Sequence, residues 1–312
     1  MLPFRDHAPV HTGPAPSVTV IMRSKNSADT IGQALAGLFA QRYDDVELLV
    51  VDSGSTDRTL EIVRQYPARL IEIAASDYYP GPVLNLAIAE SRTDLVVFQN
   101  SDVVPLTPDA LRALVAPFGD PAVQATFGRQ VPRPEAHTWV RRDYAAAFPA
   151  SGDAPSWLPY SLPFAAMRKS AWQSRPFYAD AWGSEDTEWG AWARRAGHPV
   201  AYVPGAAVMH SHNYALRQLF GRRFIEGEAD AFVPGTSGSA LGQARRALTA
   251  VARDVAWHLR AGDLRGLVQS PARRAVYHWA YYRGYRHGAA RRARGDRDAS
   301  VGQQVVLSRY EG

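Results

Sequence analysis

Three polar clusters, each following a short apolar run, carry residue types that bind anions and cations. Carboxylate and amide oxygens ligate divalent cations, and arginine, serine and asparagine donate hydrogen bonds to phosphates. One such cluster alone would be an ordinary turn or helix cap, but three at the ends of successive runs predict a shared binding edge. The clusters are Arg23, Ser24 and Asn26 after the run 18–22, Asp52 and Ser53 after 46–51, and Asn100, Ser101 and Asp102 after 95–99.

Asp102 is the acid best placed to hold a metal ion, because it lies just past an apolar strand. His210 and His212 follow another short apolar run, and alternate residues of a strand project to the same side. Imidazole with carboxylate suits Mn²⁺ better than Ca²⁺, and Mg²⁺ sites also use carboxylates. The sequence therefore predicts a Mn²⁺ or Mg²⁺ site at these three residues, and two structural histidines are the alternative.

A pair of acids, Glu185 and Asp186, begins a helical segment and could supply a general base. The positive end of the helix dipole stabilises an ionised carboxylate there, which can then accept a proton. Trp182, Gly183 and Trp189 flank the pair, and indole rings offer apolar faces to a ligand. A charged pair on a solvated helix is the alternative.

The elements that must position these residues alternate between strand and helix over the first hundred residues. Such alternation predicts a mostly parallel sheet with helices on both faces. Ligands of these sheets bind at the carboxyl ends of the strands, where the three clusters lie. The strands are expected at 18–22, 46–51, 70–73 and 95–99, with a turn at 79–82 and a short helix at 83–90.

After residue 120 this alternation weakens. The proline-rich segment 130–160 is expected to be irregular. A helix beginning near the acid pair is expected to end at Ala196, because Gly197 follows it. Two short strands are expected at 200–203 and 207–209.

Charge divides the chain into a slightly acidic body and a basic tail. Residues 1–235 carry 21 Lys and Arg against 25 Asp and Glu, whereas residues 236–312 carry 14 Arg against 5 acids. We expect a mobile leader at 1–16, a main domain at 17–235 and a basic helical extension at 236–312. Cysteine is absent, which excludes disulfides, thiolate zinc sites and a cysteine nucleophile.

The basic extension is expected to form two helices, at 240–261 and 271–294. The second interleaves tyrosine and tryptophan with arginine, a composition that suits an anionic membrane surface. Packing on the main domain, or on a second copy in a homo-oligomer, is the alternative, and nothing matches a nucleic-acid module. No run reaches the ~18 apolar residues of a membrane span. We therefore expect a cytoplasmic location, peripheral to the inner face of the membrane.

The order of these motifs resembles glycosyltransferase family 2, which has the GT-A fold. The resemblance covers about residues 17–232 and rests on VTVIMRSKN, VELLVVDSGSTDRTLEIV, NSDVVP, GSEDTEWGAWARRAG and VMHSH. GRQVP, HSHNY and RRFIEGEA are most similar to bacterial rhamnosyltransferase-like enzymes of cell-surface glycan and polysaccharide assembly. The resemblance implies a Rossmann-like α/β sheet and inverting transfer of a hexose or deoxyhexose. The donor would be a nucleotide-diphospho-sugar, and the acceptor a glycan or a lipid-linked glycan.

The resemblance also implies roles for the residues at the binding edge. Asp186 would be the catalytic base, with Glu185 as second candidate, and Trp182, Gly183 and Trp189 would contact the acceptor. The metal would be held by Asp102 with His212 or His210, and the leaving diphosphate by Arg129, Arg222 or Arg223. The donor contacts implied are Arg23, Ser24, Asn26, Asp52, Ser53, Asn85, Asn100, Ser101 and Arg129.

One position departs from the family pattern. Asn100 stands where the first acid of the Asp-x-Asp motif is expected, and it brings no charge. Weak or partial metal dependence is therefore expected. A sugar-nucleotidyltransferase is one alternative, but it would carry a glycine-rich loop where residues 23–26 have none. A non-catalytic glycan-binding or scaffold protein is the other, and it would not need Asp186.

Overall fold

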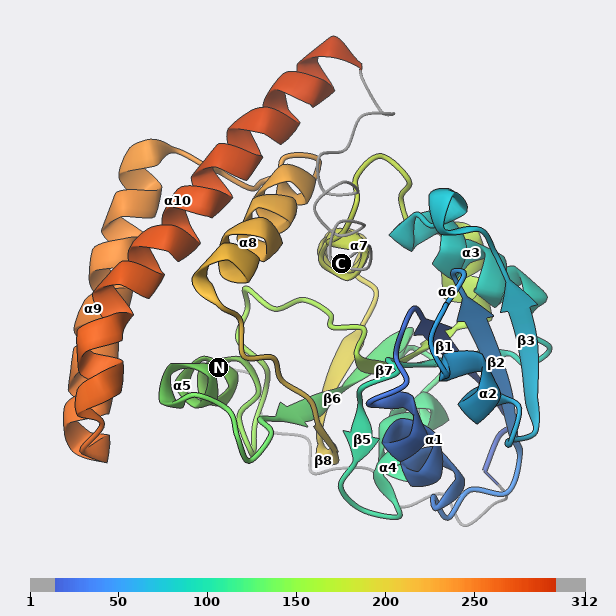
Figure 1. The fold of residues 1–312 in the computed structure, drawn as a ribbon. Helices are drawn as coiled ribbons and strands as arrows, with labels where there is room; N and C mark the ends of the chain where they lie inside the picture. Colours follow the sequence, from blue (N-terminus) through green and yellow to red (C-terminus); the bar gives the residue numbers. More distant parts are fainter. Residues whose placement is uncertain (1–14, 296–312) are drawn as a thin grey trace.

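A mixed eight-stranded sheet forms the centre of the protein, seen in a computed structural model that describes residues 15–295 (Figure 1). The strand order is β3-β2-β1-β4-β7-β6-β8-β5. The leader expected at 1–16 therefore lies almost wholly outside the described residues. The strands are β1 (Val18–Ser24), β2 (Val46–Asp52), β3 (Ala68–Glu72), β4 (Leu95–Gln99), β5 (Val104–Pro105), β6 (Ala125–Val131), β7 (Phe164–Arg168) and β8 (Val200–Met209).

The first half of the sheet is parallel, as the strand–helix alternation predicts. β1 pairs with β2 and β4, and β2 pairs with β3, all in parallel. The register sets Ser24 opposite Asp52, so the carboxyl ends of β1 and β2 lie side by side. β7 then runs antiparallel to both β4 and β6, which makes the second half mixed. The expected α/β architecture is confirmed.

Helices cover both faces of the sheet because its strands alternate two sets of apolar side chains. Val20 and Met22 of β1 point into one core, whereas Ile21 points into the other. The first core is closed by α1 (Ile31–Phe39), α2 (Thr59–Val63) and α4 (Ala110–Val115); the second by α3 (Pro80–Glu90), α6 (Lys169–Ser174) and α7 (Glu185–Arg195).

Three local expectations are wrong. The segment expected to be irregular contains α5 (Thr138–Ala147), whose ends fall inside the flanking prolines. The two short strands expected near residue 205 are one strand, β8, with a register shift opposite Gly128 and Arg129 of β6. The expected turn at 79–82 is the start of α3, since proline is accepted in the first turn of a helix.

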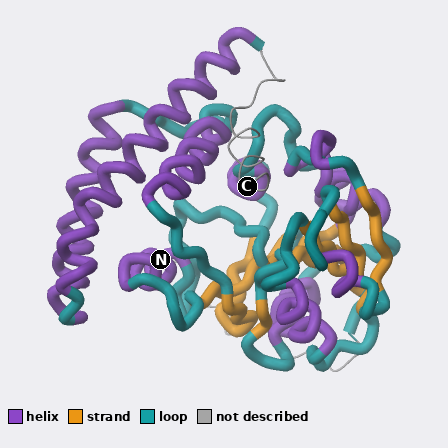
Figure 2. Tube along the Cα trace, in the orientation of Figure 1, coloured by secondary structure: helices purple, strands orange, loops and turns teal. Residues whose placement is uncertain are grey.

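Three further helices gather on one side of the strands, as Figure 2 shows. α9 (Ala240–Ala261) has the bounds expected from the sequence. α10 (Leu264–Arg294) begins before the expected start at Pro271, because the Asp263 carboxylate caps it by accepting a hydrogen bond from the Gly266 amide at 2.8 Å. α8 (Leu216–Asp230) was not expected, since the glycines within it weaken helix propensity. Among the described helices, none has the length and apolar character that a bilayer span requires.

α10 lies directly against α8 (Figure 1). Gly227 of α8 and Gly284 of α10 permit the close approach: a Cβ on Gly284 would collide with the carbonyl oxygen of Phe224. An ion pair between Glu228 and Arg291, 2.7 Å apart and almost fully buried, joins the same two helices. The packing of the extension on the main domain, one of the two alternatives, is therefore observed for α10.

Candidate active site

A cleft of about 570 Å³ opens at the carboxyl edge of the parallel strands. The edge forms because β1, β2 and β4 run in the same direction, so the loops that follow them meet. α7 and α8 supply the opposite wall. The expected site residues that line the cleft are Arg23, Ser24, Asn26, Ser53, Asn100, Ser101, Asp102, Trp182, Gly183, Glu185, Asp186 and His212.

The structure does not place every expected donor residue on this cleft. Asp52 is fully buried, and its carboxylate accepts hydrogen bonds from the Ser24 hydroxyl at 2.6 Å and from the Ser55 amide and hydroxyl at 2.7 Å. These bonds tie the loop after β1 to the loop after β2. Asp52 therefore shapes the cleft through the two loops that it joins, and three donors already occupy its carboxylate.

Asn85, Arg129 and Trp189 also lie off the cleft. The Asn85 amide donates to the Phe177 carbonyl oxygen at 2.8 Å and accepts from the Phe177 amide at 3.0 Å, which fixes a loop against α3. Trp189 is fully buried in the core, and its indole donates to the Arg175 carbonyl oxygen at 2.9 Å. A strand-end or helix-start position in the sequence does not distinguish a cleft residue from a core residue.

The acid pair at the start of α7 divides into two different environments. Glu185 forms an ion pair with Arg23 at 3.2 Å. Asp186 instead accepts hydrogen bonds from the backbone amides of Leu162 at 3.2 Å and Thr187 at 2.7 Å. Burial, reinforced by the negative charge of Glu185, raises the pKa of Asp186 to about 6. A carboxylate with a pKa near neutrality is well matched to accept a proton at pH 7.

The turn before the acid pair adopts an uncommon backbone conformation. Gly183 has φ 126° and Ser184 has φ 54°, in the left-handed region that non-glycine residues rarely enter. The Tyr178 hydroxyl donates to the Gly183 carbonyl oxygen at 2.8 Å. Ser184 is hydrogen-bonded to Asp230 of α8, a carboxyl whose pKa is raised by burial.

Asp230 links this turn to the C-terminal helices. Its carboxylate accepts a hydrogen bond at 2.8 Å from the Tyr281 hydroxyl of α10. The path Tyr281–Asp230–Ser184 thus runs from the basic extension to the residue directly before the acid pair. Sequence reasoning missed it, because the three residues come from three distant elements and match no motif.

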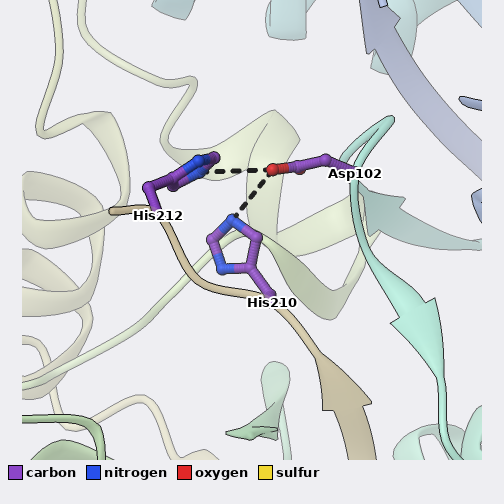
Figure 3. Close-up of side chains that lie close together, drawn as sticks. All are labelled: Asp102, His210 and His212. Atoms are coloured by element: carbon purple, nitrogen blue, oxygen red, sulfur yellow. Dashed lines mark ion pairs between the residues drawn. The ribbon is translucent and has the colours of Figure 1, made fainter. Parts of the chain in front are cut away.

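Asp102, His210 and His212 come together at the ends of β4 and β8 (Figure 3). One ligand atom from each lies within 4.8 Å of the others. The nearest Asp102 oxygen is 3.5 Å from His210 Nε2 and 3.2 Å from His212 Nε2. The expected convergence of these three residues is therefore observed.

The protonation of His210 tests whether this cluster fits a cation. Its Nδ1 lies 2.7 Å from the side-chain oxygen Oε1 of Gln130, and the side-chain nitrogen of Gln130 donates to the Ser161 hydroxyl. Because that oxygen can only accept, Nδ1 carries the hydrogen and Nε2 presents a lone pair. Nε2 is buried without a hydrogen-bond partner, and burial lowers the pKa of His210 to about 4. A neutral lone pair facing a carboxylate fits a site for a divalent cation between them.

Two further arginines line the cleft, and of these only Arg222 was expected from the sequence. Arg133, which no motif marked, donates from its guanidinium to the Asp102 carbonyl oxygen at 2.6 Å. Arg222 reaches the cleft from α8, with its Nε 3.1 Å from Glu226. Arg223 instead lies 3.7 Å over the Tyr277 ring, and Arg129 is absent from the cleft lining. The helical phase of α8 decides which arginine points inward.

Comparison with known proteins adds to this geometry. The family model described as Glycosyl transferase family 2 matches residues 19–181, just over half of the 312 residues. The O-antigen chain rhamnosyltransferase RfbN of Salmonella typhimurium is 29% identical over 230 residues, which cover 70% of this chain and 73% of that protein. The O-antigen chain rhamnosyltransferase WbaN of Salmonella anatum is 29% identical over 232 residues, covering 70% and 74%.

Solved structures share the fold at lower sequence identity. The mannosyltransferase PcManGT from Pyrobaculum calidifontis, in complex with GDP-Man and Mn²⁺, aligns with a TM-score of 0.57 and 20% identity over 97% of this chain and 82% of that chain. TarS 1–349 of S. aureus, in complex with UDP-GlcNAc, aligns with a TM-score of 0.51 and 15% identity over 89% and 92%. These likenesses establish the architecture of this chain.

Proposed function

The chain belongs to glycosyl transferase family 2, and from that membership we propose that it performs inverting transfer of a sugar from a nucleotide-diphospho-sugar to an acceptor hydroxyl. One observation carries the proposal: the half-buried carboxylate of Asp186 lines the same cleft as Asp102 and His212, two of the three residues that could hold a metal ion. Direct displacement at the anomeric carbon forms no covalent intermediate. It therefore needs one base, in contrast to the carboxylate pair of retaining glycosidases.

Asp186 acts as the general base in this scheme. The pKa of an alcohol is far above 7, so its proton must leave as the oxygen attacks, a step worth ~10²–10⁴-fold in rate. With a pKa of about 6, Asp186 is ionised at pH 7 and still basic enough to hold the proton. Trp182 and Gly183, which line the cleft shortly before the acid pair, would support the acceptor sugar.

In this scheme Asp102, His210 and His212 would hold a divalent cation. When bound there, the cation supplies positive charge against the negative charge that develops on the leaving diphosphate. Arg133 and Arg222 add fixed positive charge in the same cleft. Asn100 lines the cleft as a neutral amide, so the set of metal ligands contains a single carboxylate.

The proposed pathway is the assembly of a bacterial cell-surface polysaccharide, with a deoxyhexose as the first sugar to test. This assignment is supported by the relatives RfbN and WbaN, whose names describe O-antigen chain rhamnosyltransferases. The acceptor would be a growing glycan, free or lipid-linked. We place the catalytic domain at 17–235 and the extension at 236–312, with α10 buttressing α8.

A thermal-shift panel tests the donor assignment. The intact chain is heated with UDP-, GDP- and dTDP-sugars, each with and without Mn²⁺, because a ligand that binds only the folded state raises the melting temperature. We expect one nucleotide class to raise it, more strongly with Mn²⁺. Release of the nucleoside diphosphate from that donor should then be lost in Asp186→Asn and kept in Glu188→Gln, whose carboxylate pairs with Arg175 away from the cleft. No shift with any donor, or unchanged turnover in Asp186→Asn, would contradict the proposal.

A further inference from the structure

Exposed apolar side chains concentrate on the two C-terminal helices α9 and α10. Of the thirteen large hydrophobic side chains that are exposed among residues 15–295, seven lie in this helical pair. Several of these side chains are mostly exposed to solvent: Leu248 is 73% exposed and Val268 is 79% exposed. The seven are Leu241, Leu248, Trp257, Leu259, Leu264, Val268 and Trp279.

Most of these side chains form stripes along the helices. Leu241, Leu248 and Leu259 are spaced by seven and eleven residues, which places them within ~20° of one another around α9. The opposite side of α9 is buried and polar, with Asp254 and His258 facing inward. The hydrophobic stripe of α9 thus points away from the protein, the reverse of what core packing would produce.

The same arrangement recurs on α10. Leu264, Val268 and Trp279 share one exposed side, whereas Tyr281 and Gly284 on the other side pack against α8. The indole of Trp279 lies 5.6 Å from the Tyr282 ring, and the Arg283 guanidinium lies 5.7 Å from the indole. Aromatic rings with adjacent arginines are typical of a membrane–water interface.

Charge on these helices has a single sign at the surface. The two acids between residues 240 and 295 are engaged: Asp254 is buried against Arg274 at 2.7 Å, and Asp263 pairs with His258 at 3.0 Å. No ion pair with an acid within residues 15–295 involves the exposed arginines. These are Arg245, Arg246, Arg253, Arg260, Arg265, Arg283, Arg286, Arg292 and Arg294. We call these arginines and the apolar stripes the basic–apolar face, with the exception of Arg292, which donates to the Ala231 carbonyl oxygen at the end of α8.

We propose that the basic–apolar face docks on an anionic lipid bilayer. Leucine, valine and tryptophan side chains enter the acyl region, and the arginines bind the anionic headgroups. A second copy of this chain would bring two strongly basic surfaces together, which like-charge repulsion disfavours. A nucleic acid would engage the arginines but leave the leucine stripes in water. The inference goes beyond the proposed function and does not depend on it.

Docking by this face also has a consequence for the acceptor. α10 contacts α8, and α8 contributes Arg222 and Ile225 to the cleft. The cleft wall is therefore one helix away from the proposed membrane contact. A lipid-linked glycan in the same bilayer would be presented near the site where Asp186 lies.

Vesicle flotation with the full chain tests this proposal. The vesicles contain either phosphatidylcholine alone or phosphatidylcholine with about 30% phosphatidylglycerol, because each basic residue near an anionic surface adds ~1 kcal/mol. We expect binding to the anionic vesicles that weakens with salt. The double variant Leu248→Glu/Leu259→Glu should reduce the partition coefficient at least tenfold. Leu106→Glu, at an exposed leucine outside the helices, is the matched control and should bind like the natural chain.

Each other result overturns the proposal. These are equal binding to both vesicle types, no binding, or the same loss in Leu106→Glu as in the double variant. Concentration-dependent dimerisation that the double variant abolishes would instead identify a second copy as the occupant. Retention of an oligonucleotide with no effect of the leucine changes would identify a polyanion. Since both leucines are exposed, circular dichroism and an unchanged melting temperature establish that the variants fold.

Discussion

The pH dependence of turnover gives the sharpest test of the acid pair. If Asp186 is the base, the rate requires its ionised form and rises with pH through the pKa of about 6. A single titration at that pKa leaves the base about nine-tenths ionised at pH 7 and about one-tenth ionised at pH 5. We therefore expect kcat to fall about tenfold between these pH values. His210 does not titrate there, because its pKa is about 4.

The perturbation that separates the two acids is Glu185→Gln. The pKa of Asp186 is raised first by burial and then by the charge of Glu185. Removing that charge, with Arg23 left beside the site, should move the acid limb of the kcat profile to lower pH. The limb should stay above 3.8, the ordinary value for an aspartic acid, because burial remains. The variant should then keep a larger share of its own maximum rate at pH 5.

The assay follows release of nucleoside diphosphate at saturating donor and Mn²⁺ between pH 4.5 and 8. Glu188→Gln is the matched control, since Glu188 lies on the same helix and is buried, but it pairs with Arg175. The acid limb of the kcat profile of Glu188→Gln should stay near pH 6. A flat wild-type profile, or the same displacement in both variants, would refute the reasoning that Glu185 tunes Asp186.

Three further predictions concern positioning, metal and packing. Tyr281→Phe removes the hydroxyl that donates to Asp230, so kcat should fall about tenfold while KM stays unchanged. Tyr285→Phe is the control, because it removes a hydroxyl that bonds to the Thr236 carbonyl oxygen, and it should not lower kcat selectively. Equal effects of the two changes would indicate general destabilisation. Asp102→Asn should weaken Mn²⁺ binding in calorimetry at least tenfold, and an unchanged affinity would remove Asp102 from the metal site. Gly284→Ala should lower the free energy of unfolding by about 1–3 kcal/mol in a urea titration, because the new Cβ would collide with α8. Gly205→Ala is the control, since a Cβ at Gly205 has room. An equal loss of stability in the control would contradict the argument.

Much of the site follows from the sequence because it lies at the ends of regular elements. Alternating apolar runs predict the parallel strands, and parallel strands bring their carboxyl ends to one edge. Arg23, Asn26 and Asp102 can therefore be assigned to a common cleft from their positions along the chain. The His-x-His spacing likewise predicts that His210 and His212 lie near a strand end, which the structure confirms.

Burial and long-range contacts do not follow from the sequence in the same way. Asp52 and Trp189 stand at positions that resemble binding residues, yet hydrogen bonding and packing place both in the interior. Arg222 enters the cleft because of its position around the axis of α8. The glycines within this helix make it hard to predict from the sequence. The homo-oligomer and the cytoplasmic location stay predictions.

The sequence by itself determined the family pattern, the α/β architecture and the polar residues that follow its strands, because periodicity and strand order are local properties of the chain. Only the tertiary structure decided the chemistry of those residues. Burial within the fold raises the pKa of Asp186, and His210 presents a lone pair because the side-chain oxygen of Gln130 accepts from its other nitrogen. Gln130 is far from His210 in sequence, and the burial of Asp186 depends on the packing of the whole fold, so both protonation states are set by the surroundings in space.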